Sequence, residues 1–270
     1  AASDVYKRQE EESPLHILCV GDVVGKSGCE HLRRVLPAVK RQYAIDVCIV
    51  NGENAADGNG ITPAAAVHIL DSGADVITGG NHTFRRREFY ERLEEEPYLL
   101  RPANYPVGAP GSGLFVVDRG RYQVTVINLM GVVYMEPLDS PFDTLDRLLE
   151  EAGRPKFCVV DFHAEATAEK KALALYADGR ISALFGTHTH VQTADEQILP
   201  NGTGFLTDVG MTGPVQSVLG VCPEQAIDKM RRKLPVRFAT ADGPSEMQAV
   251  LFTLDDASGQ TTAVERLRIG

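Results

Sequence analysis

Short apolar, β-branched runs recur along this chain of 270 residues, and several of them end directly in a polar cluster that contains glycine. Such a run, bounded by glycine, indicates a buried strand. Three strand-then-helix units in succession imply a parallel sheet with right-handed crossovers. The polar clusters that follow the runs are Gly21-Asp22, Asn51-Gly52-Glu53-Asn54, Gly79-Gly80-Asn81-His82, Asp161-Phe162-His163 and Gly186-Thr187-His188-Thr189-His190.

The order of the predicted elements favours two sheets. Early parallel units are followed by strands that a tight turn at 119–122 joins as a hairpin, and this order predicts stacked sheets with helices on the outer faces. The fold class is therefore α/β, as one domain over residues 14–270. We expect residues 1–13 to be a disordered or non-native leader. Predicted strands cover 16–20, 46–50, 75–78, 114–118, 123–128, 157–161, 181–185, 204–208, 247–254 and 262–267, and helices cover 32–39, 63–70, 85–96, 142–152, 168–177 and 224–233.

Charge and cysteine content narrow the functional class. The formal net charge of -10 argues against a partner that is a nucleic-acid polymer, because such proteins usually carry a basic face. The five cysteines include no CxxC pair, so neither a disulfide framework nor a thiolate zinc site is expected. No apolar run has membrane-spanning length and no secretion signal is recognisable, so we predict a cytoplasmic protein without a membrane partner. The sequence leaves open whether the protein forms a homo-oligomer.

The polar clusters predict a single site. Open α/β sheets bind ligands beyond the carboxyl ends of their strands, where the loops converge. Asp22, Glu53, Asn81, His163 and His188 all follow their predicted strands closely, so we expect them to meet in space. Oxygen and nitrogen donors without a thiolate suit manganese, iron or zinc.

The same residues predict two metal ions. His188 and His190 are two positions apart, so in extended backbone they point the same way and each ring can reach one of two adjacent ions. Glu53 is the best-placed carboxylate to bridge them. Two ions about 3.5–4 Å apart would clamp a phosphoryl oxygen and generate a hydroxide nucleophile. His82, beside Asn81, is the candidate general acid that protonates the leaving group.

Together these motifs resemble the calcineurin-like metallophosphoesterases, and more narrowly their YmdB-like bacterial branch. The resemblance runs from about Leu15 to the C-terminus. It is carried by the clusters above and by Gly21-Asp22-Val23-Val24-Gly25, Arg101-Pro102-Ala103-Asn104, Asp161-Phe162-His163-Ala164-Glu165, Gly186-Thr187-His188-Thr189-His190-Val191-Gln192 and Thr207-Asp208-Val209-Gly210-Met211-Thr212-Gly213-Pro214.

The resemblance implies a four-layer αββα sandwich of two stacked mixed sheets, with two divalent or mixed-valence ions, iron or manganese before zinc. It assigns one ion to Asp22, Glu53, Asn54 and His190, and the other to Glu53, Asn81, His163 and His188, with Glu53 bridging. Val24 stands where the superfamily usually has a histidine, and Asn54 is the candidate to replace it. The implied substrate is a small phosphodiester, with cyclic nucleotides as the best candidates.

Other interpretations stay open. A regulatory protein would keep the metal cleft and act by binding a nucleotide or a partner, and a two-ion amide hydrolase would use a similar clamp. Asp161 and Glu165 either orient a histidine ring or cap the chain locally. The arginines at 85–87 either steer an anion or form a solvated helix face. Residues 210–214 are either a mobile loop at the cleft or a turn.

Overall fold

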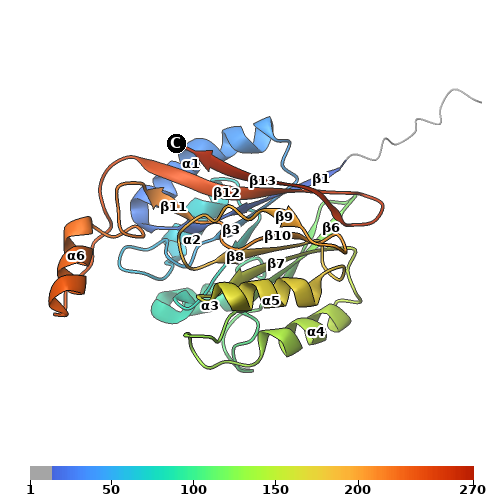
Figure 1. The fold of residues 1–270 in the computed structure, drawn as a ribbon, viewed down its shortest axis with the longest axis horizontal. Coiled ribbons are helices and arrows are strands. Elements are labelled where there is room, and N and C mark those ends of the chain that lie inside the picture. Colours follow the sequence, from blue (N-terminus) through green and yellow to red (C-terminus); the bar gives the residue numbers. More distant parts are fainter. Residues whose placement is uncertain (1–13) are drawn as a thin grey trace, which may run out of the picture.

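The computed structural model describes residues 14–270, so the predicted leader at 1–13 lies outside the described residues. Within the described part, helices flank two β-sheets (Figure 1). The elements are β1 (Leu15–Val20), β2 (Asp22–Val23), α1 (Gly25–Gln42), β3 (Val47–Asn51), α2 (Pro63–Asp71), β4 (Val76–Thr78), the 3₁₀ turns η1 (Thr83–Arg85) and η2 (Arg87–Phe89), α3 (Tyr90–Glu95), β5 (Leu114–Asp118), β6 (Gln123–Met130), α4 (Pro141–Glu151), β7 (Phe157–His163), α5 (Thr167–Ala177), β8 (Ala183–Thr187), β9 (Gln197–Ile198), β10 (Gly204–Leu206), β11 (Met211–Pro214), α6 (Pro223–Arg232), β12 (Ser245–Leu254) and β13 (Thr261–Ile269).

Both sheets are mixed, with a parallel centre. In the described chain the first is seven-stranded, in the order β2-β11-β12-β1-β3-β4 with β13 added beside β12. Strands β1, β3 and β4 are parallel, while β12 runs antiparallel to β1. The second sheet is six-stranded, in the order β5-β6-β7-β8-β10-β9, and β6, β7, β8 and β10 are parallel. The predicted hairpin is the antiparallel pair of β5 and β6.

Side-chain alternation along the strands produces four layers. On β1, Ile17 and Cys19 face the second sheet, while Leu18 and Val20 face the helices. One apolar cluster joins the first sheet to α1 and α2, a second lies between the sheets, and a third joins the second sheet to α4 and α5. The order helix, sheet, sheet, helix confirms the predicted αββα sandwich (Figure 1).

Local signals set several element ends. Thr62 caps α2, where its hydroxyl accepts a hydrogen bond from the Ala65 amide at 3.2 Å, and Pro63 occupies the first turn.

Among residues 14–270, no helix is both long enough and apolar enough to span a membrane.

Two local predictions are wrong. The predicted helix over 85–96 is two 3₁₀ turns followed by the short helix α3, because residue Arg86 has extended backbone (φ -116°, ψ 108°). Its side chain donates instead to the Asp57 and Asn59 carbonyls. Residues 211–214, predicted as a loop or turn, form β11, which pairs with both β2 and β12.

Candidate metal centre

The predicted site residues gather where the parallel strands of both sheets end. Asp22 lies on β2, just beyond β1, and the clusters at 51–54 and 79–82 follow β3 and β4. From the second sheet, His163 ends β7, Thr187 ends β8, and the segment 188–190 follows β8. Asn51 connects the two sheets, since its amide donates to Asp161 of β7 at 3.1 Å. The cleft therefore lies between the carboxyl ends of two stacked sheets.

Glu53, His163 and His188 form the tightest group of donors. One potential ligand atom from each of these side chains lies within 4.8 Å of the others. Nε2 of His163 lies 3.3 Å from Oε1 of Glu53 and 3.1 Å from Nδ1 of His188. The Asn81 amide oxygen is 2.9 Å from the same His163 nitrogen. One carboxylate, two imidazoles and an amide oxygen thus point at one small volume.

Asp22, Asn54 and His190 form a second group of donors beside Glu53. Nε2 of His190 is 3.6 Å from the Asp22 carboxylate and 3.2 Å from the Asn54 amide nitrogen. The Asn54 amide also donates to Glu53 at 3.0 Å, so Glu53 contacts both groups of donors. The structure therefore brings together all seven predicted ligand residues, and Asn54 occupies the space beside Asp22.

His82 contacts the carboxylate of Glu53. Its backbone amide donates to Oε2 of Glu53 at 2.8 Å, and its Nδ1 lies 2.8 Å from the Asn54 amide oxygen. Because an amide oxygen can only accept, Nδ1 carries the hydrogen in that contact. Nε2 is directed to the outer side, 3.4 Å from the Asn59 amide nitrogen. The ring is thus fixed on one side and accessible on the other.

Asp161 acts on the centre through a threonine. It accepts from the Thr187 hydroxyl at 2.7 Å, and this hydroxyl lies 2.9 Å from Nδ1 of His163. Thr78 donates to the other oxygen of Asp161 at 2.5 Å. Complete burial raises the pKa of Asp161 to about 6, although His163 and these hydrogen bonds lower it in part. Of the two roles that the sequence left open for Asp161, this geometry favours orientation of a histidine ring, with Thr187 between the two side chains.

Charge in the centre favours cations. Burial alone would raise the pKa of Glu53, but His163 and His82 outweigh burial, and the pKa lies well below its usual range. Burial alone would lower the pKa of His163, but Glu53 and Asp22 raise it to about 9. Buried carboxylates that stabilise positive charge this strongly, in contact with imidazole and amide donors, suit transition-metal ions.

The backbone shows why small residues and unusual conformations occur here. A Cβ on Gly80 would lie 2.3 Å from His163 and 2.4 Å from Glu53, so any side chain would fill the centre. His188 and His190 have positive φ angles of 98° and 63°, so the backbone here is not extended, contrary to what their spacing led us to expect. Such angles are rare outside glycine and cluster at functional sites.

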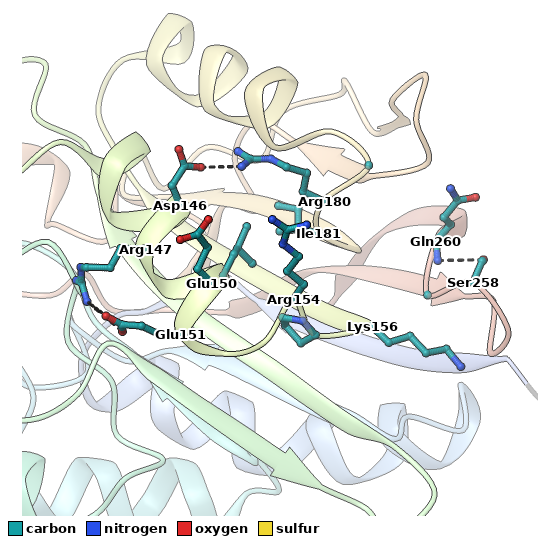
Figure 2. A pocket seen from close by; sticks show the side chains of 14 residues that line it. Asp146, Arg147, Glu150, Glu151, Arg154, Lys156, Arg180, Ile181, Ser258 and Gln260 are labelled. Atoms are coloured by element: carbon teal, nitrogen blue, oxygen red, sulfur yellow. Dashed lines mark hydrogen bonds and ion pairs between the residues drawn. The ribbon is translucent and has the colours of Figure 1, made fainter.

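Two cavities flank the centre, and a larger one lies elsewhere. A cavity of about 360 Å³ borders Asn81 and His188, and one of about 60 Å³ borders Asn54 and His190. A third, of about 970 Å³, contains none of the predicted site residues. Figure 2 shows its charged wall, where Asp146 and Arg180 form an ion pair, as do Arg147 and Glu151. Glu150, Arg154 and Lys156 also line this wall, and none of the predicted metal ligands borders it.

Several known proteins are similar to this chain. The family model described as "YmdB-like protein" matches residues 18–267, nearly the whole chain. The chain belongs to this family. A relative from Bacillus subtilis, named 2′,3′-cyclic-nucleotide 2′-phosphodiesterase, is 45% identical over 256 residues, which cover 94% of this chain and 97% of that protein. The predicted membership of the YmdB-like family is thereby confirmed.

Solved structures agree on the fold. A crystal structure titled as a novel phosphatase from Mycoplasma pneumoniae superposes with a TM-score of 0.90 at 32% identity, covering 96% of this chain and 94% of that one. The NAD nucleotidase of Haemophilus influenzae, at 12% identity, has a TM-score of 0.59 over 95% of this chain and 56% of its own. That second likeness supports the shared sandwich alone.

Sequence reasoning missed several residues that shape the centre. Lys170 is fully buried and donates to Asp208 at 2.7 Å and to the Thr187 carbonyl at 2.8 Å. A lysine in a helix with an alanine-rich flank gives no sign of this role in the sequence. Glu165, for which two roles were open, lies 3.0 Å from Nε2 of His188 and so contacts the centre.

Proposed function

We propose that this chain is a dinuclear metal-dependent phosphodiesterase that hydrolyses small phosphodiesters, with cyclic nucleotides as its substrate class. Family membership and the identity of 45% to a cyclic-nucleotide phosphodiesterase support a phosphoric diester hydrolase. The observation that carries the finer proposal is the position of Glu53, whose buried carboxylate contacts one donor of each group, Asn54 and His163, through the same oxygen. We treat residues 14–270 as one cytoplasmic catalytic domain within the same proposal.

The donors divide into two sets around Glu53. Asp22, Asn54 and His190 would hold one ion with it, and Asn81, His163 and His188 would hold the other. The distances of 2.9–3.6 Å among these side chains support this division, because each set is already assembled. Carboxylate, imidazole and amide donors favour iron or manganese, with zinc as a further candidate.

When bound, the two ions would supply Lewis acidity toward a phosphoryl oxygen and activation of water. The protein contributes the leaving-group proton. Nδ1 of His82 donates to Asn54, so the doubly protonated ring would deliver its Nε2 proton to the departing oxygen and return to the neutral form. Glu53, which accepts from the His82 amide, fixes the backbone that carries this ring. Thr187 and Asp161 keep His163 in one orientation.

Hydrolysis of 2′,3′-cyclic AMP and of bis(p-nitrophenyl) phosphate, with manganese or iron present, tests the activity. Turnover of both is expected, and a folded, metal-loaded protein that hydrolyses neither would contradict the proposal. A peptide substrate assayed in parallel should stay intact, which separates this function from a two-ion amide hydrolase. Elemental analysis of Glu53→Gln should show reduced occupancy of both ions; full loading would refute the bridging role.

His82→Ala tests the acid separately. Metal content should stay near that of the wild type, while turnover should fall most on substrates with poor leaving groups, because only these need the proton. A loss of about 10²–10⁴-fold on an alkyl ester is expected from general acid catalysis. Equal losses on aryl and alkyl esters would remove His82 from this role.

A further inference from the structure

The wall of the cavity beside Asn81 and His188 also contains residues that have no role in the proposed hydrolysis. Its lining contains two tyrosines and an arginine, Tyr105, Tyr134 and Arg85. At about 360 Å³ it lies within the size range of small-molecule sites. The cavity on the opposite flank, beside His190, measures only about 60 Å³. A substrate held at the centre therefore has room for a bulky group on the Tyr134 side.

Tyr134 is presented to this space in an unusual way. Its side chain is 89% exposed, and its φ angle is +63°. The exposed ring leaves an aromatic face open to solvent at the cavity, and a positive φ on a bulky residue marks local strain. Two proposed metal ligands, Asn81 and His188, line the same cavity as Tyr134.

The loop that carries Tyr134 is fixed at its two ends. Buried Glu169 accepts from the amides of Val132 and Val133, at 2.9 and 3.3 Å. At the other end, the Asn104 amide donates to the Asp139 carbonyl at 3.0 Å and also to the Met130 carbonyl. The base of the loop is held in place, so the position of Tyr134 over the cavity is set by the fold.

Tyr105 forms the inner part of the same wall. Its ring packs edge to face against Phe84, with centroids 5.0 Å apart. Burial, with Glu136 and Glu53 nearby, raises the pKa of the Tyr105 hydroxyl to about 12, although Arg85 lowers it in part. A neutral, half-buried phenol beside an exposed tyrosine face offers an aromatic surface with little charge of its own.

We propose that Tyr134, with Tyr105 behind it, forms the subsite for the heteroaromatic base of a nucleoside phosphodiester. The inference rests on the proposed function and deepens it. Bases stack on tyrosine faces without requiring one particular sequence of hydrogen bonds, so this wall would accept more than one base. Tyr134 thereby contributes to substrate selection, while the metal ligands act on the phosphate.

Two cyclic phosphodiesters test this subsite. Cyclic 2′,3′-AMP carries a base, whereas glycerol 1,2-cyclic phosphate has the same five-membered ester and no base. In Tyr134→Ala, kcat/KM for the nucleotide should fall about 5- to 150-fold, the range for loss of one stacked base. For the glycerol ester it should change by less than about twofold, since only the wall has changed.

Matched variants sharpen the result. Tyr134→Phe keeps the ring and should retain nucleotide activity, while Phe238→Ala removes the partly exposed ring bordering the small cavity and should leave both substrates unaffected. Adenosine 3′-phosphate binding, measured by calorimetry without metal, should weaken in Tyr134→Ala alone. Equal losses on both esters, no loss on either, or a base-dependent loss only in Phe238→Ala would overturn the subsite. If the wild type hydrolyses neither ester, the proposed function itself fails.

Discussion

Replacing Lys170 with methionine should destabilise the protein and also loosen the backbone around His188, a proposed metal ligand. Lys170 and Asp208 are both essentially fully buried, and their ion pair measures 2.7 Å. Asp208 also accepts from the amides of Thr189, at 3.1 Å, and Gly210, at 2.9 Å. Lys170 itself donates to the Thr187 carbonyl. The pair therefore holds the backbone on both sides of His188, where φ is positive.

The expected cost follows from burial. Removing one partner of a buried pair leaves an uncompensated charge, which costs about 3–5 kcal/mol. Lys170→Met should lower the free energy of unfolding by that amount. Adding Asp208→Asn removes the stranded carboxylate, so the double variant should be more stable than Lys170→Met alone, although one amide then loses its acceptor, at about 1–3 kcal/mol.

Urea denaturation monitored by circular dichroism measures these differences through the midpoint and slope of the transition. Lys171→Met is the matched control. Lys171 is the next residue on α5, only half-buried, and donates to Gln197 at 2.9 Å, so its loss should cost below about 1 kcal/mol. Manganese affinity in folded Lys170→Met should fall about 10- to 100-fold, as for other residues that orient ligands. A loss in Lys170→Met no larger than in Lys171→Met, or an even less stable double variant, would refute the reasoning.

Three further predictions concern single positions. Thr187→Val should weaken metal affinity about 10- to 100-fold in titrations, because His163 loses its hydroxyl contact. Unchanged affinity would show that Thr187 does not orient His163 for metal binding. Gly80→Ala should lower metal content by elemental analysis while melting shows a folded protein, since its Cβ would enter the centre; full loading would contradict this. Burial raises the pKa of Asp195, but hydrogen bonds from Thr207 and Thr193 outweigh it and lower the pKa. The stability this carboxylate contributes is present above its unfolded pKa of about 3.9 and is lost as pH falls through the folded value. In urea denaturation the advantage of wild type over Asp195→Asn should therefore shrink below about pH 4, and a constant difference would argue against it.

The sequence by itself determined the sandwich and the donor types of the centre. Runs such as 16–20 and 157–161 are apolar on both faces, as strands covered on both sides must be, and helices or hairpins between them limit the topology. Because parallel strands deliver their following loops to one edge, Glu53 and His163 could be placed together although 110 positions separate them.

Tertiary structure alone decided which side chains support that centre. Lys170 pairs with Asp208 across 38 positions, and Thr187 intervenes between Asp161 and His163. Such contacts depend on angstrom-scale packing between layers, which hydrophobic periodicity does not encode. The same holds for the strand β11, which pairs with β2 and β12 at positions far apart in the chain, and for Tyr134, which only a fixed loop brings beside the cleft. The local sequence specifies which side chains lie at each strand end. The packing of the two sheets specifies which residues those side chains contact.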